Sequence, residues 1–135
     1  MGYLLGLDIG TTHLKAGIFT EQGEPVIVKL ASTPVLNLGA GRAIYDPGQL
    51  WVKVSGLLRE VTSQLEPGTQ ILSVAIASMG EAGLLLDTDG EPLTPIIAWF
   101  DSRGKDVIDK WAHCFGVERT LSITGLIPDY IYSLM

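Results

Sequence analysis

Residues 6–19 read GLDIGTTHLKAGIF, and in this stretch two apolar runs flank a short polar segment. A buried strand, a tight turn and a second strand account for the hydrophobic pattern. They do not explain why Asp8, Gly10, Thr11 and Thr12 gather at the turn. The residues alone leave two interpretations open: an ordinary hairpin turn, or a cradle for phosphate and a metal ion.

The cradle interpretation gives each polar residue of the turn a role. Gly10 lets backbone N–H groups approach phosphate oxygens closely, and the threonine hydroxyls add donors. Asp8, at the end of the first strand, can hold hydrated Mg²⁺ through water, and Lys15 can place a positive charge near the transferring phosphate. The stretch matches neither the P-loop nor the dinucleotide pattern G-x-G-x-x-G.

Composition and charge limit the classes of protein to which the chain can belong. Its 135 residues are 47% hydrophobic and 18% charged, which is typical of one globular domain with a real core. A net charge of −6 offers no basic surface to nucleic acid, and no apolar run approaches the ~18 residues of a membrane span. Because Cys114 is the only cysteine, no internal disulfide can form. We expect a cytoplasmic protein that binds neither nucleic acid nor membrane.

The hydrophobic pattern predicts an α/β fold that begins with an antiparallel meander. Residues 3–9, 14–20 and 25–32 are the three predicted strands. Their connections are too short to hold crossover helices, so the strands should be antiparallel. Residues 33–45 predict a loop or an irregular hairpin, because they have no clean period.

A helix should follow, with Asp46 as N-cap, Pro47 at the first position and Gln49 completing a capping box. We expect this helix to end at Pro67 and Gly68. The next strand, residues 70–77, is almost continuously apolar, which is typical of a strand in a parallel sheet that is covered on both faces.

The remaining residues predict a hairpin and short helices. The hairpin turns at Asp89–Gly90, and Ser102 caps a helix over residues 103–114. Another helix is expected over 117–123, and Pro128 with Asp129 looks like the opening of a third. His13, His113 and Cys114 lack partners at metal-ligand spacing and are expected to have ordinary structural places.

The turn resembles the first phosphate motif of the actin-like ATPase superfold, in the form used by FGGY carbohydrate kinases. The pattern D-x-G-T-T/S-x-x-K/R-x-x-x-F is matched at Asp8, Gly10, Thr11, Thr12, Lys15 and Phe19. YDPGQLW at 45–51, the stretch from VAIASMGEAG to AWFDSRG at 74–104 and ITGLIPD at 123–129 are similar to later segments of the family, in the same order. The resemblance covers nearly the whole chain.

The resemblance implies a ribonuclease H-like domain: a mixed sheet with a three-stranded antiparallel meander, followed by a helix and a parallel strand. It implies ATP-dependent phosphorylation of a sugar or polyol, with ATP and Mg²⁺ bound at Asp8, Gly10, Thr11, Thr12 and Lys15, and the metal at Asp8. In this family the catalytic base, the second phosphate motif and the adenosine pocket come later, in a second domain. Residues 1–135 would then be the N-terminal, sugar-binding side of a longer chain, truncated and inactive alone.

The same resemblance places the substrate loop at Met79, Gly80 and Glu81, and the family's W-D-R segment at Trp99, Asp101 and Arg103. Related kinases often carry a histidine, or an arginine next to glutamate, where this chain has Gly80–Glu81, so the particular sugar stays open. The plainer alternatives are an exposed loop charge for Glu81, a core position for Trp99 and a helix-start pair for Asp101 and Arg103.

Two other functions stay open on the residues alone. One is a different actin-superfold ATPase, such as a chaperone-like or activator ATPase, and the other is a small binding module without catalysis. The partners we expect are the sugar and the remainder of the protein's own chain, and an exposed apolar interdomain face would make a homodimer possible.

Overall fold

The computed structural model describes residues 2–132, and these form two compact units. The first unit contains the described residues up to Val35 together with Asp46–Met79. The second contains Leu36–Tyr45 and the described residues from Gly80 onward. Among residues 2–132, no helix is long and apolar enough to cross a membrane.

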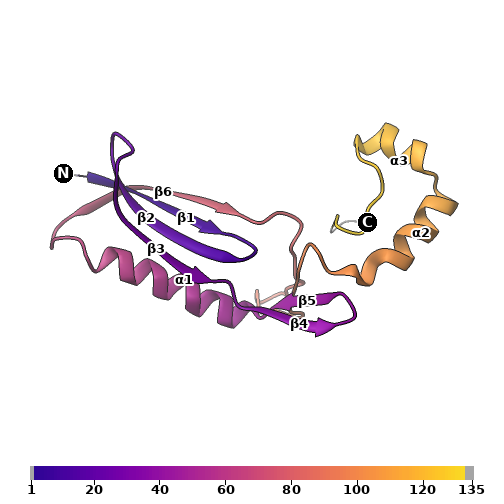
Figure 1. Ribbon diagram of the computed structural model, residues 1–135, viewed down its shortest axis with the longest axis horizontal. Helices are drawn as coiled ribbons and strands as arrows, with labels where there is room; N and C mark the ends of the chain where they lie inside the picture. Colours follow the sequence, from indigo (N-terminus) through magenta and orange to yellow (C-terminus); the bar gives the residue numbers. More distant parts are fainter. Residues whose placement is uncertain (1, 133–135) are drawn as a thin grey trace. The chain divides into compact units, whose positions relative to one another are not determined.

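The first unit is built on a four-stranded sheet in the order β3-β2-β1-β6 (Figure 1). Its strands are β1 (Gly2–Ile9), β2 (His13–Thr20), β3 (Pro25–Ser32) and β6 (Gln70–Ser78). The first three pair antiparallel, whereas β6 runs parallel to β1. The predicted meander followed by a helix and a parallel strand is therefore confirmed.

Helix α1 (Pro47–Thr62) packs on one face of this sheet against β2 and β3 (Figure 1). Its buried side chains meet alternate residues of β1 and β2, which point to the same face of the sheet. The members of this core are Leu5, Leu7, Leu14, Ala16, Ile18, Val54, Leu57 and Val61. Lys29 of β3 also reaches across to Glu60 of α1, with 3.2 Å between Nζ and Oε1.

The predicted start of α1 is confirmed, but its predicted end is wrong. The Asp46 carboxylate accepts a hydrogen bond of 2.7 Å from the backbone N–H of Gln49, and Pro47 occupies the first turn. The helix ends at Thr62, before Pro67 and Gly68. The hydroxyls of Thr62 and Ser63 donate to carbonyls of the last turn, so these carbonyls are satisfied without another helical turn.

The expectation that residues 70–77 are covered on both faces is wrong for the described part of the chain. Strand β6 lies at the sheet edge, and Val74 and Ile76 leave 57% and 65% of their surfaces exposed. The face of the sheet away from α1 is also left uncovered by the described residues, since Val28 and Leu30 on that face are more than half exposed. An apolar strand therefore predicted the parallel pairing but not its burial.

The second unit contains a small three-stranded sheet and two helices. Strands β4 (Val35–Gly39) and β5 (Arg42–Tyr45) form the hairpin that was one alternative for residues 33–45, and β5 pairs antiparallel with β7 (Ile96–Ile97). The chain then forms a 3₁₀ turn, η1 (Ser102–Gly104), followed by α2 (Lys105–Cys114) and α3 (Val117–Thr124). The predicted helix over 117–123 is confirmed.

Two further local predictions are tested in this unit. The hairpin turn at Asp89–Gly90 is confirmed, since Gly90 has φ 85° and the backbones of Asp87 and Glu91 pair across it. The cap at Ser102 is wrong: Asp101 accepts the bond from the N–H of Arg103 and begins η1, and α2 starts later, at Lys105.

At the far end of the second unit, Asp129 accepts hydrogen bonds from the N–H groups of Ile131 and Tyr132, as the first turn of a helix would. The rest of the predicted third helix lies outside the described residues.

Candidate functional site

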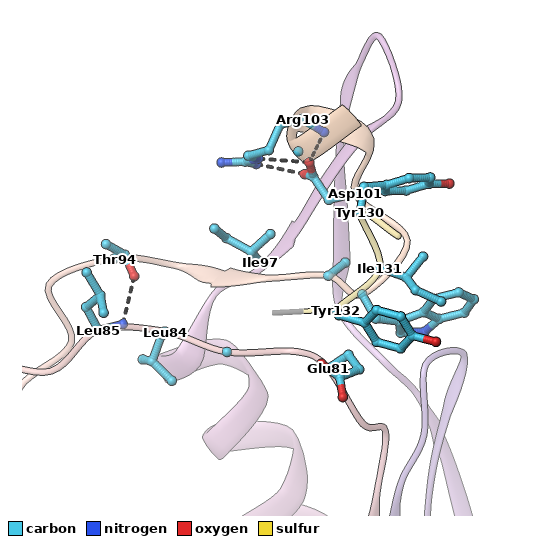
Figure 2. Close-up of a pocket in the computed structure, with 14 residues that line it drawn as sticks. Glu81, Leu84, Leu85, Thr94, Ile97, Asp101, Arg103, Tyr130, Ile131 and Tyr132 are labelled. Carbon is cyan, nitrogen blue, oxygen red and sulfur yellow. Dashed lines mark hydrogen bonds and ion pairs between the residues drawn. The ribbon is translucent and has the colours of Figure 1, made fainter. Parts of the chain in front are cut away.

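A pocket of about 510 Å³ in the second unit collects four of the six candidate substrate residues (Figure 2). Glu81, Trp99, Asp101 and Arg103 all line it. Figure 2 shows the Asp101–Arg103 pair on one side of the pocket and Glu81 with Tyr132 on the other. Met79 and Gly80 are not among its lining residues.

Asp101 is the fixed polar anchor of this pocket. Its side chain is fully buried and accepts four hydrogen bonds: from Arg103 N–H, Nε and Nη2 at 2.9, 2.8 and 2.7 Å, and from the N–H of Ala43 in β5 at 2.8 Å. The two parallel bonds from the guanidinium make a bidentate pair. The structure therefore confirms that Asp101 and Arg103 pair at the start of a helical turn, which was the plainer interpretation of these two residues.

The ionisation of this pair follows from its contacts. The Arg103 guanidinium, above all, and the N–H groups of Arg103 and Ala43 hold the pKa of Asp101 well below its usual range, although burial acts in the other direction. Asp101 in turn raises the pKa of Arg103. Both groups of the pair are therefore charged and held in place in the pocket wall. The Arg103 side chain is 37% exposed, so it can contact a ligand.

Trp99 and Glu81 present different surfaces to the pocket. Trp99 is 38% exposed, so it is a pocket wall and not a core side chain, and Phe100 braces it edge-to-face with ring centroids 5.5 Å apart. Glu81 is exposed and has φ 58°, a left-handed conformation that costs a non-glycine residue energy. Strained backbone of this kind gathers at functional sites, which favours a role for Glu81 beyond that of a loop charge.

Sequence reasoning missed the aromatic side chains at the far end of the described chain. Tyr130 and Tyr132 line the pocket together with Ile131. The pattern PDYIY was interpreted only as a helix start, although alternating tyrosines after a polar turn are a signal for a binding surface. Another part of the pocket lining is apolar and contains Leu84, Leu85 and Ile97. Such a mixture of apolar walls and a few polar groups suits a small polar organic ligand.

The candidate phosphate residues lie together at one end of β1 and β2, in the first unit. Gly10 and His13 close the turn with a bond of 3.1 Å from N–H to carbonyl, leaving Thr11 and Thr12 at the tip. A Cβ on Gly10 would lie 2.8 Å from the His13 carbonyl oxygen. The turn itself therefore requires glycine at position 10, whether or not phosphate binds.

Asp8 and Lys15 are cross-strand partners beside this turn. Their carboxylate Oδ2 and ammonium Nζ are 3.3 Å apart, and about half of each side chain is exposed. The described residues contain no cluster of three or more histidine, cysteine or acidic side chains that could hold a metal. The donor set is thus one carboxylate and two threonine hydroxyls, all hard oxygens, which fits Mg²⁺ because that ion keeps several waters and needs few protein ligands.

Comparison with known proteins gives a consistent result. The model of the FGGY family of carbohydrate kinases, N-terminal domain, matches residues 3–135. The gluconokinase of Bacillus subtilis is 32% identical over 111 residues, covering 82% of this chain and 21% of that protein. The glycerol kinase of Parabacteroides distasonis is 30% identical over 135 residues, covering 97% of this chain and 27% of its own.

Among solved structures, the glycerol kinase of Plasmodium falciparum with ADP superposes with a TM-score of 0.91 at 20% identity, over 98% of this chain and 27% of that one. This likeness supports the fold alone, which is the actin-like ATPase fold expected from the sequence. The chain thus spans about a quarter of the length of the relatives it matches.

Proposed function

Because the chain belongs to the FGGY family of carbohydrate kinases, we propose that it is part of an enzyme that phosphorylates a hydroxyl group of a sugar or polyol with ATP. One observation carries the proposal: three segments that match the family, around Glu81, Trp99 and Tyr130, line a single pocket of the second unit. The relatives are named as kinases of gluconate, glycerol and L-xylulose, all small polyhydroxylated molecules. The match to this family argues against the other actin-superfold ATPases.

In this proposal the pocket holds the sugar by complementary chemistry on its two sides. The Glu81 carboxylate accepts hydrogen bonds from sugar hydroxyls, and the face of Trp99 packs against C–H groups of the carbon chain. Arg103, fixed by Asp101, offers its remaining N–H groups as donors. Met79 and Gly80 directly precede Glu81 in the sequence and set the path of the loop that carries it.

The turn between β1 and β2 would bind the phosphates. Bound ATP with Mg²⁺ supplies the phosphoryl group. Gly10, which has no Cβ, lets phosphate oxygens approach the turn closely, the hydroxyls of Thr11 and Thr12 donate to them, Asp8 holds waters of the metal ion, and Lys15 adds one positive charge. Because this charge is local, the site tolerates the net charge of −6.

A further part of the protein completes this enzyme in the proposal. The chain spans about a quarter of the length of its relatives, so we assign the catalytic base, the second phosphate motif and the adenosine pocket to residues outside it. Residues 1–135 are then the N-terminal, sugar-binding side, and the remainder of the same protein is their partner. The enzyme works in the cytoplasm, where ATP and Mg²⁺ are available, and a homodimer is compatible with the exposed apolar strands.

The test is a panel of sugars assayed with the complete protein that contains this chain. ADP release is followed with gluconate, glycerol, L-xylulose and other pentoses, hexoses and polyols, with and without Mg²⁺. We expect turnover with one class, and Glu81→Gln should lower kcat/KM for it by about tenfold or more, because a charged acceptor is lost. Glu21→Gln, an exposed loop charge in the first unit, is the matched control. No turnover with any member of the panel would contradict the proposal.

A further inference from the structure

The turn that carries Gly10, Thr11 and Thr12 is held from one side by a residue that the phosphate motif does not include. Thr33 follows β3 directly, and only 5% of it is exposed. Its hydroxyl donates a hydrogen bond of 2.7 Å to the carbonyl oxygen of Gly10. Its backbone N–H donates one of 3.0 Å to the carbonyl oxygen of Thr12.

These two bonds have different origins. The N–H bond continues the β2–β3 ladder by one step, since His13 pairs with Ser32, so any residue except proline at position 33 would make it. The hydroxyl bond crosses the turn to Gly10 and belongs to no ladder. It depends on a threonine or serine side chain, and it is the one that a side chain adds.

Because of peptide geometry, the hydroxyl bond to the Gly10 carbonyl also determines the direction of the next N–H group, which is that of Thr11. In a planar trans peptide, the C=O and the following N–H point in opposite directions. A Gly10 carbonyl that is bonded to Thr33 therefore sets the N–H of Thr11 to point away from Thr33. The same bond keeps the negative end of the carbonyl dipole away from the side where an anion would be bound.

The backbone on both sides of Thr33 makes it a firm support. Pro34 restricts the residue before it to extended conformations. The N–H of Val35 donates to the Thr33 carbonyl oxygen at 2.9 Å. The hydroxyl is thus presented to the turn by a segment with few alternative conformations.

We propose that Thr33 is a positioning residue for nucleotide binding: its hydroxyl fixes the Gly10–Thr11 peptide so that the N–H of Thr11 faces the phosphates of ATP. This inference rests on the proposed function. It predicts an effect on ATP that is separable from any loss of stability, whereas a purely structural threonine would affect stability alone.

The test compares Thr33→Val with Thr33→Ser in the complete protein that contains this chain. Valine keeps the shape and the backbone bond but loses the hydroxyl, whereas serine retains the hydroxyl. Thr120→Val is the matched control, because Thr120 is also buried, accepts a bond from Trp111 Nε1 and donates one to the Gly116 carbonyl, all within the second unit. The measurements are KM for ATP, KM for the sugar and hydrogen–deuterium exchange of the peptide covering residues 8–20 without nucleotide.

In Thr33→Val we expect faster exchange in this peptide and a KM for ATP raised by about three- to tenfold, the loss of one neutral hydrogen bond. The KM for the sugar should stay within about twofold, and Thr33→Ser should restore both readouts. Unchanged exchange, an unchanged KM for ATP, or the same rise in Thr120→Val would overturn the inference. A wild-type protein that phosphorylates no sugar would contradict the proposed function, while the exchange comparison would still test whether Thr33 holds the turn.

Discussion

Asp101 shows how much of the pocket depends on one carboxylate. Its four donors come from Ala43 and Arg103, so it joins β5 to the start of η1. Asp101→Asn should lower the free energy of unfolding at pH 7 by about 2 kcal/mol, because an amide cannot accept all four bonds and leaves Arg103 without its counter-charge. Urea unfolding followed by tryptophan fluorescence measures this loss. Asp109→Asn, an exposed change on α2, should cost less than about 0.5 kcal/mol.

The difference in free energy of unfolding between wild type and Asp101→Asn should depend on pH in a definite direction. The pKa of Asp101 is lowered in the folded protein, while in the unfolded chain it is about 3.9. A lowered pKa stabilises the fold above the unfolded value, and this stabilisation is lost as the pH falls toward the folded one. The gap between wild type and Asp101→Asn should therefore be constant from about pH 8 to pH 5 and narrow below about pH 4. A gap that widens on acidification would contradict this assignment.

Single residues also mark where sequence reasoning succeeded and where it stopped. Asp101 and Arg103 were found through their resemblance to the family's W-D-R segment, and their pairing is local because they are two positions apart. Thr33 and Gly10 are 23 positions apart, and only the register of β2 with β3 brings them together. Tyr132 enters the pocket through the path of the chain after α3, which no local period encodes.

At the scale of elements, the same substitution should have opposite effects in a turn and in a helix. Gly10→Ala places a Cβ 2.8 Å from the backbone oxygen of His13 in the β1–β2 turn, so this variant should lower the free energy of unfolding by about 1–3 kcal/mol. Gly56→Ala lies in α1 with nothing within 4 Å of the new Cβ. This variant should raise the free energy of unfolding by about 0.5–1 kcal/mol, because alanine has a higher helix propensity than glycine. Urea midpoints of the two variants measure both effects. Gly10→Ala with wild-type stability would show that the turn relaxes freely.

The elements that sequence predicted well are those whose signals are local. The strands of the meander follow apolar runs between turn residues, and Asp46 with Pro47 marks the start of α1 unambiguously. The end of α1 was misplaced because its apolar period continues to Leu65, which packs against the core from outside the helix. Strand β7 has only two residues, so it is defined by pairing with β5 and not by any pattern of its own.

At the scale of the whole molecule, burial was the property that sequence predicted least well. Residues that pair directly across β1 and β6 point to the same side, so Val74 and Ile76 share the α1 face with Leu5 and Leu7. They are nevertheless exposed, because α1 contacts β2 and β3. Composition indicates that a strand is apolar, but what covers it depends on elements far away in the sequence.

Phosphoryl transfer to a sugar needs a general base, and neither Asp101 nor Asp8 is suited to that role within these 135 residues. A general base works best when its pKa lies near the working pH. Asp101 is unsuited to that role, since Arg103 lowers its pKa and its lone pairs are engaged by four donors. Asp8 lies in the other unit beside Lys15, where the proposal assigns it to the metal ion. The chain by itself should therefore transfer no phosphoryl group from ATP to any sugar of the panel.

The measurement is ADP release by the purified 135-residue chain and by the complete protein at equal concentration, after far-UV circular dichroism has shown that the short chain is folded. Turnover should appear only with the complete protein, because in-line transfer needs a carboxylate that can take the proton of the attacking hydroxyl. Sustained sugar phosphorylation by the short chain would place that base within it. Glu81 would then be the residue to substitute first, since it is the other carboxylate that lines the pocket.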